Sequence, residues 1–179
     1  LMPPFKFKHF SINQNNTAMK VGTDGVLLGA WTTTTEGPIL DIGAGTGLIA
    51  IMLAQRTKTA LIDAIEVEDA ASLQAQDNIE TCSWKNRISI HHLPIQKFEP
   101  NITYDLIISN PPFFLTSTKA PNQERNTARH TDTLSFNDLI VSVIRLLSPN
   151  GIFSLMVLSL NSKVMSNAGW PRSCRERES

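Results

Sequence analysis

Four consecutive residues, Asn110, Pro111, Pro112 and Phe113, combine groups that suit a planar amine. The Asn110 side chain and the Pro111 backbone each offer a carbonyl oxygen, and Phe113 offers a flat apolar ring. An amide-like or exocyclic amino nitrogen is a poor nucleophile because its lone pair is delocalised. Two acceptors on its N–H bonds would draw the nitrogen toward tetrahedral geometry and expose that lone pair. The alternative is a strand that simply ends at a Pro-Pro turn.

A second candidate site is the glycine-rich segment 41–47, in which three glycines alternate with other residues before an apolar helix. Such a loop lets a ligand lie against bare main chain at a helix N-terminus. A dinucleotide-binding fingerprint needs its third glycine three residues after the second, where this chain has Leu48. An acid directly before the loop favours an amino group over a pyrophosphate, which suits the amino-acid end of S-adenosylmethionine. The residues expected to hold that end are Asp41, Gly43, Gly45 and Gly47.

Two further polar residues follow later strands of the predicted sheet. Glu66 ends the strand after the glycine-rich loop, where a carboxylate can accept both hydroxyls of a ribose. Gln96 follows the third strand and could reach the edge of an adenine. The alternative for Glu66 is a surface acid, and for Gln96 an exposed loop residue.

Composition fits one globular domain, because 41% of the 179 residues are hydrophobic and 18% are charged. A net charge of zero argues against indiscriminate nucleic-acid binding but leaves room for a local basic face. Bases gather near the start of the chain and after the Asn-Pro-Pro-Phe motif. These bases are Lys6, Lys8 and Lys20, and then Lys119, Arg125, Arg129 and His130.

Cys82 and Cys174 lie far apart and match no metal-ligand spacing, and the four histidines show none either. We therefore expect reduced thiols, no metal, and a cytoplasmic protein. The chain shows no leader pattern and no apolar run near the ~18 residues of a membrane span, so we expect no membrane partner.

Strand and helix patterns alternate along most of the chain, which predicts a parallel sheet with helices packed on it. Residues 5–20 read as an irregular lead-in or a short hairpin, and Thr23-Asp24 as the cap of a first helix. Asp69 is expected near the cap of a later helix, and Ser135 starts a capping box. The expected strands are 38–42, 61–65, 88–92, 104–108 and one ending at 158 after a turn at 149–151, and the expected helices are 23–31, 46–56, 69–80 and one from Ser135 to 147.

In combination, these motifs resemble a class I S-adenosylmethionine-dependent methyltransferase that methylates amines. Segment 41–47 matches the cofactor loop, Glu66 the ribose acid and segment 110–113 the target-amine motif. More narrowly, segments 19–31 and 109–114 are similar to those of bacterial tRNA adenine-N6 methyltransferases that modify the adenosine 3′ of a valine tRNA anticodon. Within the first of these segments, we place Lys20 and Thr23 among the cofactor-binding residues, and Asn110 joins them from the motif.

The resemblance implies an α/β Rossmann-like fold with a doubly wound, mainly parallel sheet. We divide the single domain into a lead-in and cap helix (1–35), a core (36–158) and an irregular tail (159–179). The family usually has Tyr where Phe113 stands. It also continues into a further helix and an antiparallel hairpin, which we expect to be missing or altered in this chain.

The resemblance also implies a function. We expect methyl transfer from S-adenosylmethionine to N6 of an adenosine in tRNA, by a monomer. A related methyltransferase that acts on the glutamine N5 of protein release factors has a nearly identical Asn-Pro-Pro-aromatic motif and is the first alternative. A non-catalytic protein that binds S-adenosylmethionine or RNA is the second.

Overall fold

Five parallel strands form the central sheet of the computed structural model, which describes residues 3–15, 17, 20–111 and 134–156. The spatial order of the strands is β5-β4-β3-β6-β7. The chain thus enters the sheet at its centre, winds outward to β5 and then crosses back to β6 on the other side of β3. Open α/β sheets bind ligands where the strand order reverses in this way, which here is between β3 and β6. The strands are β3 (Ile39–Ile42), β4 (Ile62–Glu66), β5 (Ile88–His92), β6 (Tyr104–Ser109) and β7 (Leu147–Leu155).

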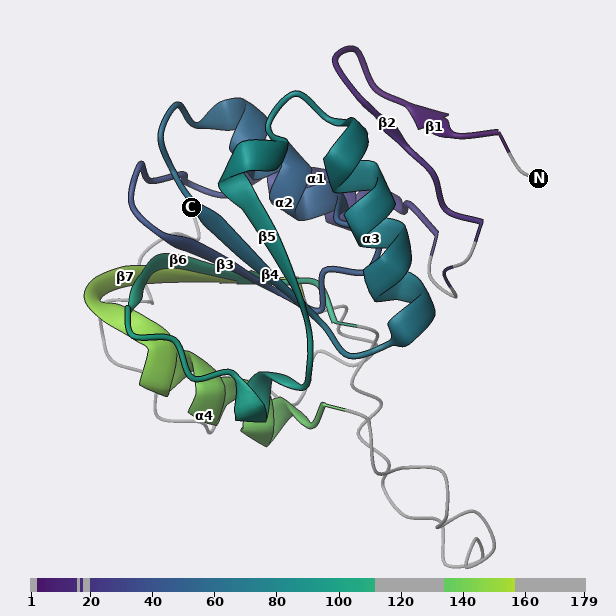
Figure 1. Cartoon of the computed structure of the whole chain (residues 1–179). Coiled ribbons are helices and arrows are strands. Elements are labelled where there is room, and N and C mark those ends of the chain that lie inside the picture. Colours follow the sequence, from purple (N-terminus) through teal and green to yellow (C-terminus); the bar gives the residue numbers. More distant parts are fainter. Residues whose placement is uncertain (1–2, 16, 18–19, 112–133, 157–179) are drawn as a thin grey trace, which may run out of the picture.

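Helices cover both faces of the sheet (Figure 1). Helices α1 (Thr23–Trp31), α2 (Leu48–Arg56) and α3 (Asp69–Thr81) lie on one face, and α4 (Phe136–Leu146) lies on the other. Two short 3-10 helices, η1 (Lys85–Arg87) and η2 (Ile95–Lys97), flank β5. The predicted Rossmann-like, doubly wound and parallel sheet is confirmed. The position expected for the C-terminal hairpin falls after residue 156 and lies outside the described residues.

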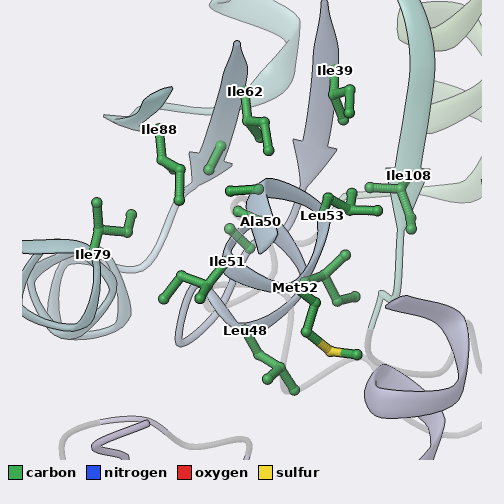
Figure 2. Packing of buried hydrophobic residues seen from close by; sticks show 14 of the residues in the cluster. Ile39, Leu48, Ala50, Ile51, Met52, Leu53, Ile62, Ile79, Ile88 and Ile108 are labelled. Carbon is green, nitrogen blue, oxygen red and sulfur yellow. The ribbon is translucent and has the colours of Figure 1, made fainter. Parts of the chain in front are cut away.

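Helix α2 is the centre of the larger core. Its residues from Leu48 to Ala54 are all buried, because one side of the helix faces the sheet and the other contacts α1 and α3. Figure 2 shows Leu53 beside Ile39 and Ile108 of the sheet, and Ile51 directed toward Ile79 of α3. Each fully buried Leu or Ile contributes about 1.5–3 kcal/mol relative to an exposed one, so this core fixes α2 and the loop that precedes it.

An antiparallel hairpin, β1 (Phe5–Lys6) and β2 (Ser11–Ile12), precedes α1. It lies beyond α3 in Figure 1, and of the two alternatives expected for residues 5–20, an irregular lead-in or a short hairpin, the structure has the hairpin. The ring of Phe10 meets that of Trp84 edge to face, with the centroids 6.2 Å apart. Aromatic contact therefore anchors the hairpin to the segment between α3 and η1.

Of the three predicted helix caps, the one at Thr23-Asp24 is wrong, because Thr23 is the first residue of α1 and Gly22 is the N-cap. The N-cap of α3 is Glu68, directly before Asp69, as expected of a cap near Asp69. Neither N-cap makes a side-chain bond: Gly22 has no side chain, and that of Glu68 makes no capping hydrogen bond. For α4 the prediction holds, since the Ser135 hydroxyl accepts a bond from the Asp138 N–H at 3.1 Å.

Two segment boundaries also differ from the prediction. Helix α2 begins at Leu48 and not at residue 46, because Gly47 has a φ of +77°, which an α-helix excludes. Residues 149–151 form no turn before β7 but lie within it. Leu147 pairs with Tyr104 and Ile152 pairs with Leu106, so the intervening residues bulge out of the ladder. Helix α4 ends one residue before the predicted 147, and β7 ends at residue 155.

Candidate active site

The carboxyl ends of β3, β4 and β6 meet at one edge of the sheet. Ile42 of β3 pairs with Ile65 of β4 on one side and with Ser109 of β6 on the other. Asp41, Glu66 and Asn110 therefore sit on three adjacent strand ends, as the two sequence motifs require. This register brings the glycine-rich loop and the Asn-Pro-Pro segment to the same place.

The carboxylate of Asp41 is fully buried and only half satisfied. Its Oδ2 atom accepts a hydrogen bond from the backbone N–H of Ala50 at 3.1 Å, whereas Oδ1 has no partner among the described atoms. Burial raises the pKa of Asp41 to about 7, with a smaller contribution from the charge of Glu66 and an opposing one from the Ala50 bond. A buried acceptor that lacks a partner is costly unless a ligand donates to it. This atom marks a position for a donor, and preferably a cationic one.

The three glycines of the loop all have left-handed backbone angles, with φ values of 75°, 55° and 77° at Gly43, Gly45 and Gly47. A β-carbon on Gly43 or Gly45 would meet no atom within 4 Å, so the main chain there is open to a ligand. Gly47 differs, because a β-carbon on it would contact Ala75 of α3 at 3.5 Å. The first two glycines expose backbone, and the third also allows α3 to approach the loop.

Glu66, at the end of the neighbouring strand β4, holds the glycine-rich loop by hydrogen bonding. Its Oε2 atom accepts from the N–H of Gly45 at 2.8 Å, and Oε1 accepts from the N–H groups of Val67 and Glu68 at 2.8 and 2.9 Å. These bonds fix the carboxylate beside the open glycines. A carboxylate has about four acceptor positions, so Glu66 still has capacity for a hydroxyl donor. The bond between Glu66 and Gly45 could not be read from the sequence.

Asn110 is the first residue after β6 and is partly buried, as is Pro111. The preceding Ser109 is buried and donates its hydroxyl to the Ile42 carbonyl of β3 at 2.8 Å, which ties the two strand ends together. The side-chain amide of Asn110 lies against α1, because a β-carbon on Gly25 would be 3.3 Å from Asn110 Nδ2. The sequence motifs do not include Gly25, although the Gly25–Gly29 spacing on one helix face is a signal of close helix packing.

Three other predicted site residues, Lys20, Thr23 and Gln96, are among the residues that the structure describes. The ammonium of Lys20 donates to the carbonyls of Gln14 and Thr17 at 2.5 and 2.9 Å, and Thr23 is exposed in the first turn of α1. Gln96 is exposed in η2, beyond the carboxyl end of β5. Their roles in cofactor binding stay predictions. Pro112, Phe113, and the bases Lys119, Arg125, Arg129 and His130 lie outside the described residues.

A hollow of about 720 Å³ lies at the opposite edge of the sheet. Its lining includes Pro38 and Thr103, which directly precede β3 and β6, so it belongs to the amino ends of the strands. The guanidinium of Arg145 is already bonded to the Phe98 and Ile95 carbonyls at 2.8 and 3.1 Å. We therefore do not connect this hollow with the site at Asp41 and Asn110.

Two of the described histidines, His91 and His92, each lie beside one acid. His91 Nε2 is 2.6 Å from Asp63 Oδ1, and His92 Nδ1 is 3.6 Å from Asp69 Oδ1. Within those ranges, no three His, Cys, Asp or Glu side chains gather closely enough to hold a metal ion. The same part of the chain has no helix that is long and apolar enough to cross a membrane.

Comparison with known proteins identifies the family. The model of the methyltransferase small domain matches residues 16–157. A relative from Flavobacterium psychrophilum is 51% identical over 157 residues, which cover 86% of this chain and 67% of the relative. A relative from Parabacteroides distasonis is 52% identical over 158 residues, which cover 87% of this chain and 66% of the relative. Both are named tRNA1(Val) (adenine(37)-N6)-methyltransferase. This chain belongs to that family of methyltransferases. The resemblance inferred from the motifs is therefore confirmed.

This methyltransferase spans about two thirds of the length of these relatives. Solved structures support the fold alone. A methyltransferase from Geobacter sulfurreducens in complex with S-adenosyl-L-homocysteine matches with a TM-score of 0.55 at 15% identity, covering 75% of this chain and 47% of that one. The glycopeptide N-methyltransferase MtfA, complexed with sinefungin, matches with a TM-score of 0.53 at 15% identity, covering 74% and 48%.

Proposed function

We propose that this methyltransferase transfers the methyl group of S-adenosylmethionine to the exocyclic N6 of an adenosine in tRNA, next to the anticodon of a valine tRNA. The observation that carries the proposal is the adjacency of Asp41, Glu66 and Asn110 on three neighbouring strand ends. A cofactor held by the first two residues lies next to an amine held by the third. The relatives' name supplies the tRNA adenine as target.

The residues present fit S-adenosylmethionine. Asp41 Oδ1 lacks a partner and suits the cofactor's amino group, and the open backbone at Gly43 and Gly45 admits the amino-acid end. Glu66 has acceptor capacity left for ribose hydroxyls, and Gln96 is assigned to the adenine edge. When bound, this cofactor supplies an electrophilic methyl carbon on a positively charged sulfur.

Asn110 and the Pro111 carbonyl act on the amine and not on the cofactor. Both accept N–H bonds, which orient the nitrogen lone pair toward the methyl carbon. The amine nitrogen would form the new N–C bond, and the electron pair of the S–C bond that breaks would leave with the cofactor's sulfur. The methylated nitrogen then loses one proton to water or to these acceptors, so no His or Glu is needed as a base. Phe113 is assigned to stack on the flipped base.

Two other functions remain distinguishable by experiment. The Asn-Pro-Pro-Phe chemistry also suits the side-chain amide of glutamine in a release factor. What favours RNA is the segment 19–31 together with the names of the relatives, which are adenine methyltransferases. A non-catalytic protein would bind the cofactor without transferring its methyl group. We further propose that the enzyme acts as a monomer in the cytoplasm, where its tRNA substrate is found.

The deciding experiment supplies methyl-labelled S-adenosylmethionine with total tRNA, bulk protein and DNA in parallel reactions, followed by nucleoside analysis. We expect the label in N6-methyladenosine from tRNA. Label in protein alone would support the glutamine alternative. Cofactor binding by calorimetry without transfer to any acceptor would support the non-catalytic alternative.

A further inference from the structure

Lysines and aromatic residues alternate along the β1–β2 hairpin. Phe5 and Phe7 alternate with Lys6 and Lys8 in the sequence; Phe5 and Lys6 form β1, and Lys8 lies in the bend that follows it. Phe7 packs against the main core, whereas both lysines are exposed. The hairpin therefore packs Phe7 inward and exposes a basic face formed by Lys6 and Lys8, and Phe5 is exposed as well.

The basic face is not neutralised by nearby acids. Residues 1–23 contain Lys6, Lys8 and Lys20 but no Asp or Glu. Among the residues that the structure describes, no ion pair involves Lys6 or Lys8, and Glu80 of the adjacent helix α3 pairs with Lys85 at 3.3 Å. Because the whole chain has no net charge, the positive potential of this face is a local feature.

Packing holds these lysines in place. The N–H of Phe7 donates to the Phe10 carbonyl at 2.9 Å, and their rings stack with centroids 4.5 Å apart. Phe10 in turn meets Trp84. The backbone that carries Lys6 and Lys8 is thus ordered in the free protein, which lowers the entropy lost when they bind a partner.

The hairpin is also tied to the cofactor loop. The buried amide of Asn78 accepts from the Asn13 N–H at 2.8 Å and donates to the Asn13 carbonyl at 2.9 Å. The same amide nitrogen donates to the carbonyl of Thr46, in the glycine-rich loop, at 2.9 Å. Figure 1 shows the chain leaving β2 and running along α3 toward the carboxyl ends of the strands. The basic face is therefore positioned relative to the site by direct hydrogen bonds.

We infer that Lys6 and Lys8 bind phosphates of the tRNA substrate, away from the reacting adenosine. The inference rests on the proposed function, which supplies the RNA. Ammonium groups held on an ordered arm suit a phosphate backbone, because such contacts position a nucleic acid without reading its sequence. An anionic lipid surface fits less well, since Phe7 and Phe10 pack into the protein and Phe5 is the one exposed phenylalanine of the hairpin, which is a small apolar edge for membrane insertion.

The test measures tRNA affinity between about 50 and 200 mM salt for Lys6→Gln, Lys8→Gln and the double variant. Lys58→Gln is the matched control, because Lys58 is an exposed lysine that precedes β4 at the amino-end edge of the sheet. We expect each hairpin variant to reduce the log–log salt slope by about 0.7–0.9, and the double variant by about 1.4–1.8. Cofactor affinity, the unfolding temperature and the Lys58→Gln slope should match those of the wild type.

The inference would be overturned if the double variant kept the wild-type salt slope for tRNA binding although the wild-type protein methylates tRNA. That result would leave the proposed function intact. Wild-type protein that neither binds nor methylates tRNA would overturn both. Binding to vesicles that contain phosphatidylserine is measured as a further comparison. If the double variant lost vesicle binding but kept its tRNA slope, the hairpin would be a lipid contact and the inference would be wrong.

Discussion

Asn110 Nδ2 lies 3.3 Å from the position that a β-carbon on Gly25 would occupy. Gly25 is in the first half of α1 and Asn110 directly follows β6, so the contact joins segments that are far apart in the chain. A distance of 3.3 Å is tighter than nearly all contacts of real β-carbons, so an added methyl group would displace the amide by a few tenths of an ångström. Gly25 thus leaves room for the amide that is proposed to hold the substrate amine.

Gly25→Ala should therefore lower turnover by about 10–100-fold, because small misplacements of a positioning group are costly. Cofactor affinity should not change. The matched control is Gly29→Ala on the same helix, where the β-carbon would meet Met52 Sδ at 2.9 Å instead of Asn110. That variant should lose about 1 kcal/mol of unfolding free energy from overpacking but keep its rate in the folded protein. Single-turnover methylation at saturating cofactor separates the two, and equal rates for both variants would remove Gly25 from the positioning role.

The buried carboxyl of Asp41 should make stability depend on pH. Its pKa is raised from 3.8 to about 7 in the folded protein, so the fold favours the protonated form. The contribution to stability is fully present below pH 3.8 and is lost as the pH rises through about 7. Between about pH 5 and 8 the wild type should lose about 1–3 kcal/mol of unfolding free energy relative to Asp41→Asn. Urea unfolding of both proteins at the two pH values measures this difference, and parallel pH profiles would show that Asp41 is not the titrating group.

Glu66→Ala should weaken S-adenosylmethionine binding by about 1–3 kcal/mol, from the loss of charge-assisted hydrogen bonds. Part of this effect comes through the loop, because Glu66 also holds the Gly45 N–H at 2.8 Å. Calorimetric titration gives the affinity. Glu68→Ala is the control, since Glu68 is an exposed acid two residues away that contributes its backbone N–H to Glu66. Equal affinities for the two variants would place Glu66 outside the cofactor site.

Much of the fold follows from local pattern. The strand at Ile88–His92 is predicted to the residue, and the capping box at Ser135 is confirmed, because periodicity and side-chain capping depend on neighbours in the sequence. The start of α2 is less predictable. A helical pattern runs through Gly47, but the left-handed angle of this glycine means that the helix begins two residues later than predicted, at Leu48.

Long-range contacts account for what the sequence could not reveal. The motifs point to Asp41, Glu66 and Asn110 as candidate site residues, yet the Glu66–Gly45 bond and the Gly25–Asn110 contact depend on how β4 and α1 dock on other elements. The bulge in β7 also depends on contacts between residues that are far apart in the sequence. Proline and glycine at 149–151 indicate a turn locally, but pairing with β6 continues on both sides of them.

The central claim is that Asn110 orients the adenine amine for methyl transfer, and single-turnover formation of N6-methyladenosine in tRNA tests it most directly. Asn110→Ala is compared at saturating cofactor with Asn101→Ala, an exposed asparagine that precedes β6 at the opposite edge of the sheet. We predict a rate lower by about 10²–10³-fold for Asn110→Ala, with unchanged cofactor affinity, and a wild-type rate for Asn101→Ala. A near-normal rate in folded, cofactor-saturated Asn110→Ala would contradict the assignment of the motif and the base-free mechanism built on it.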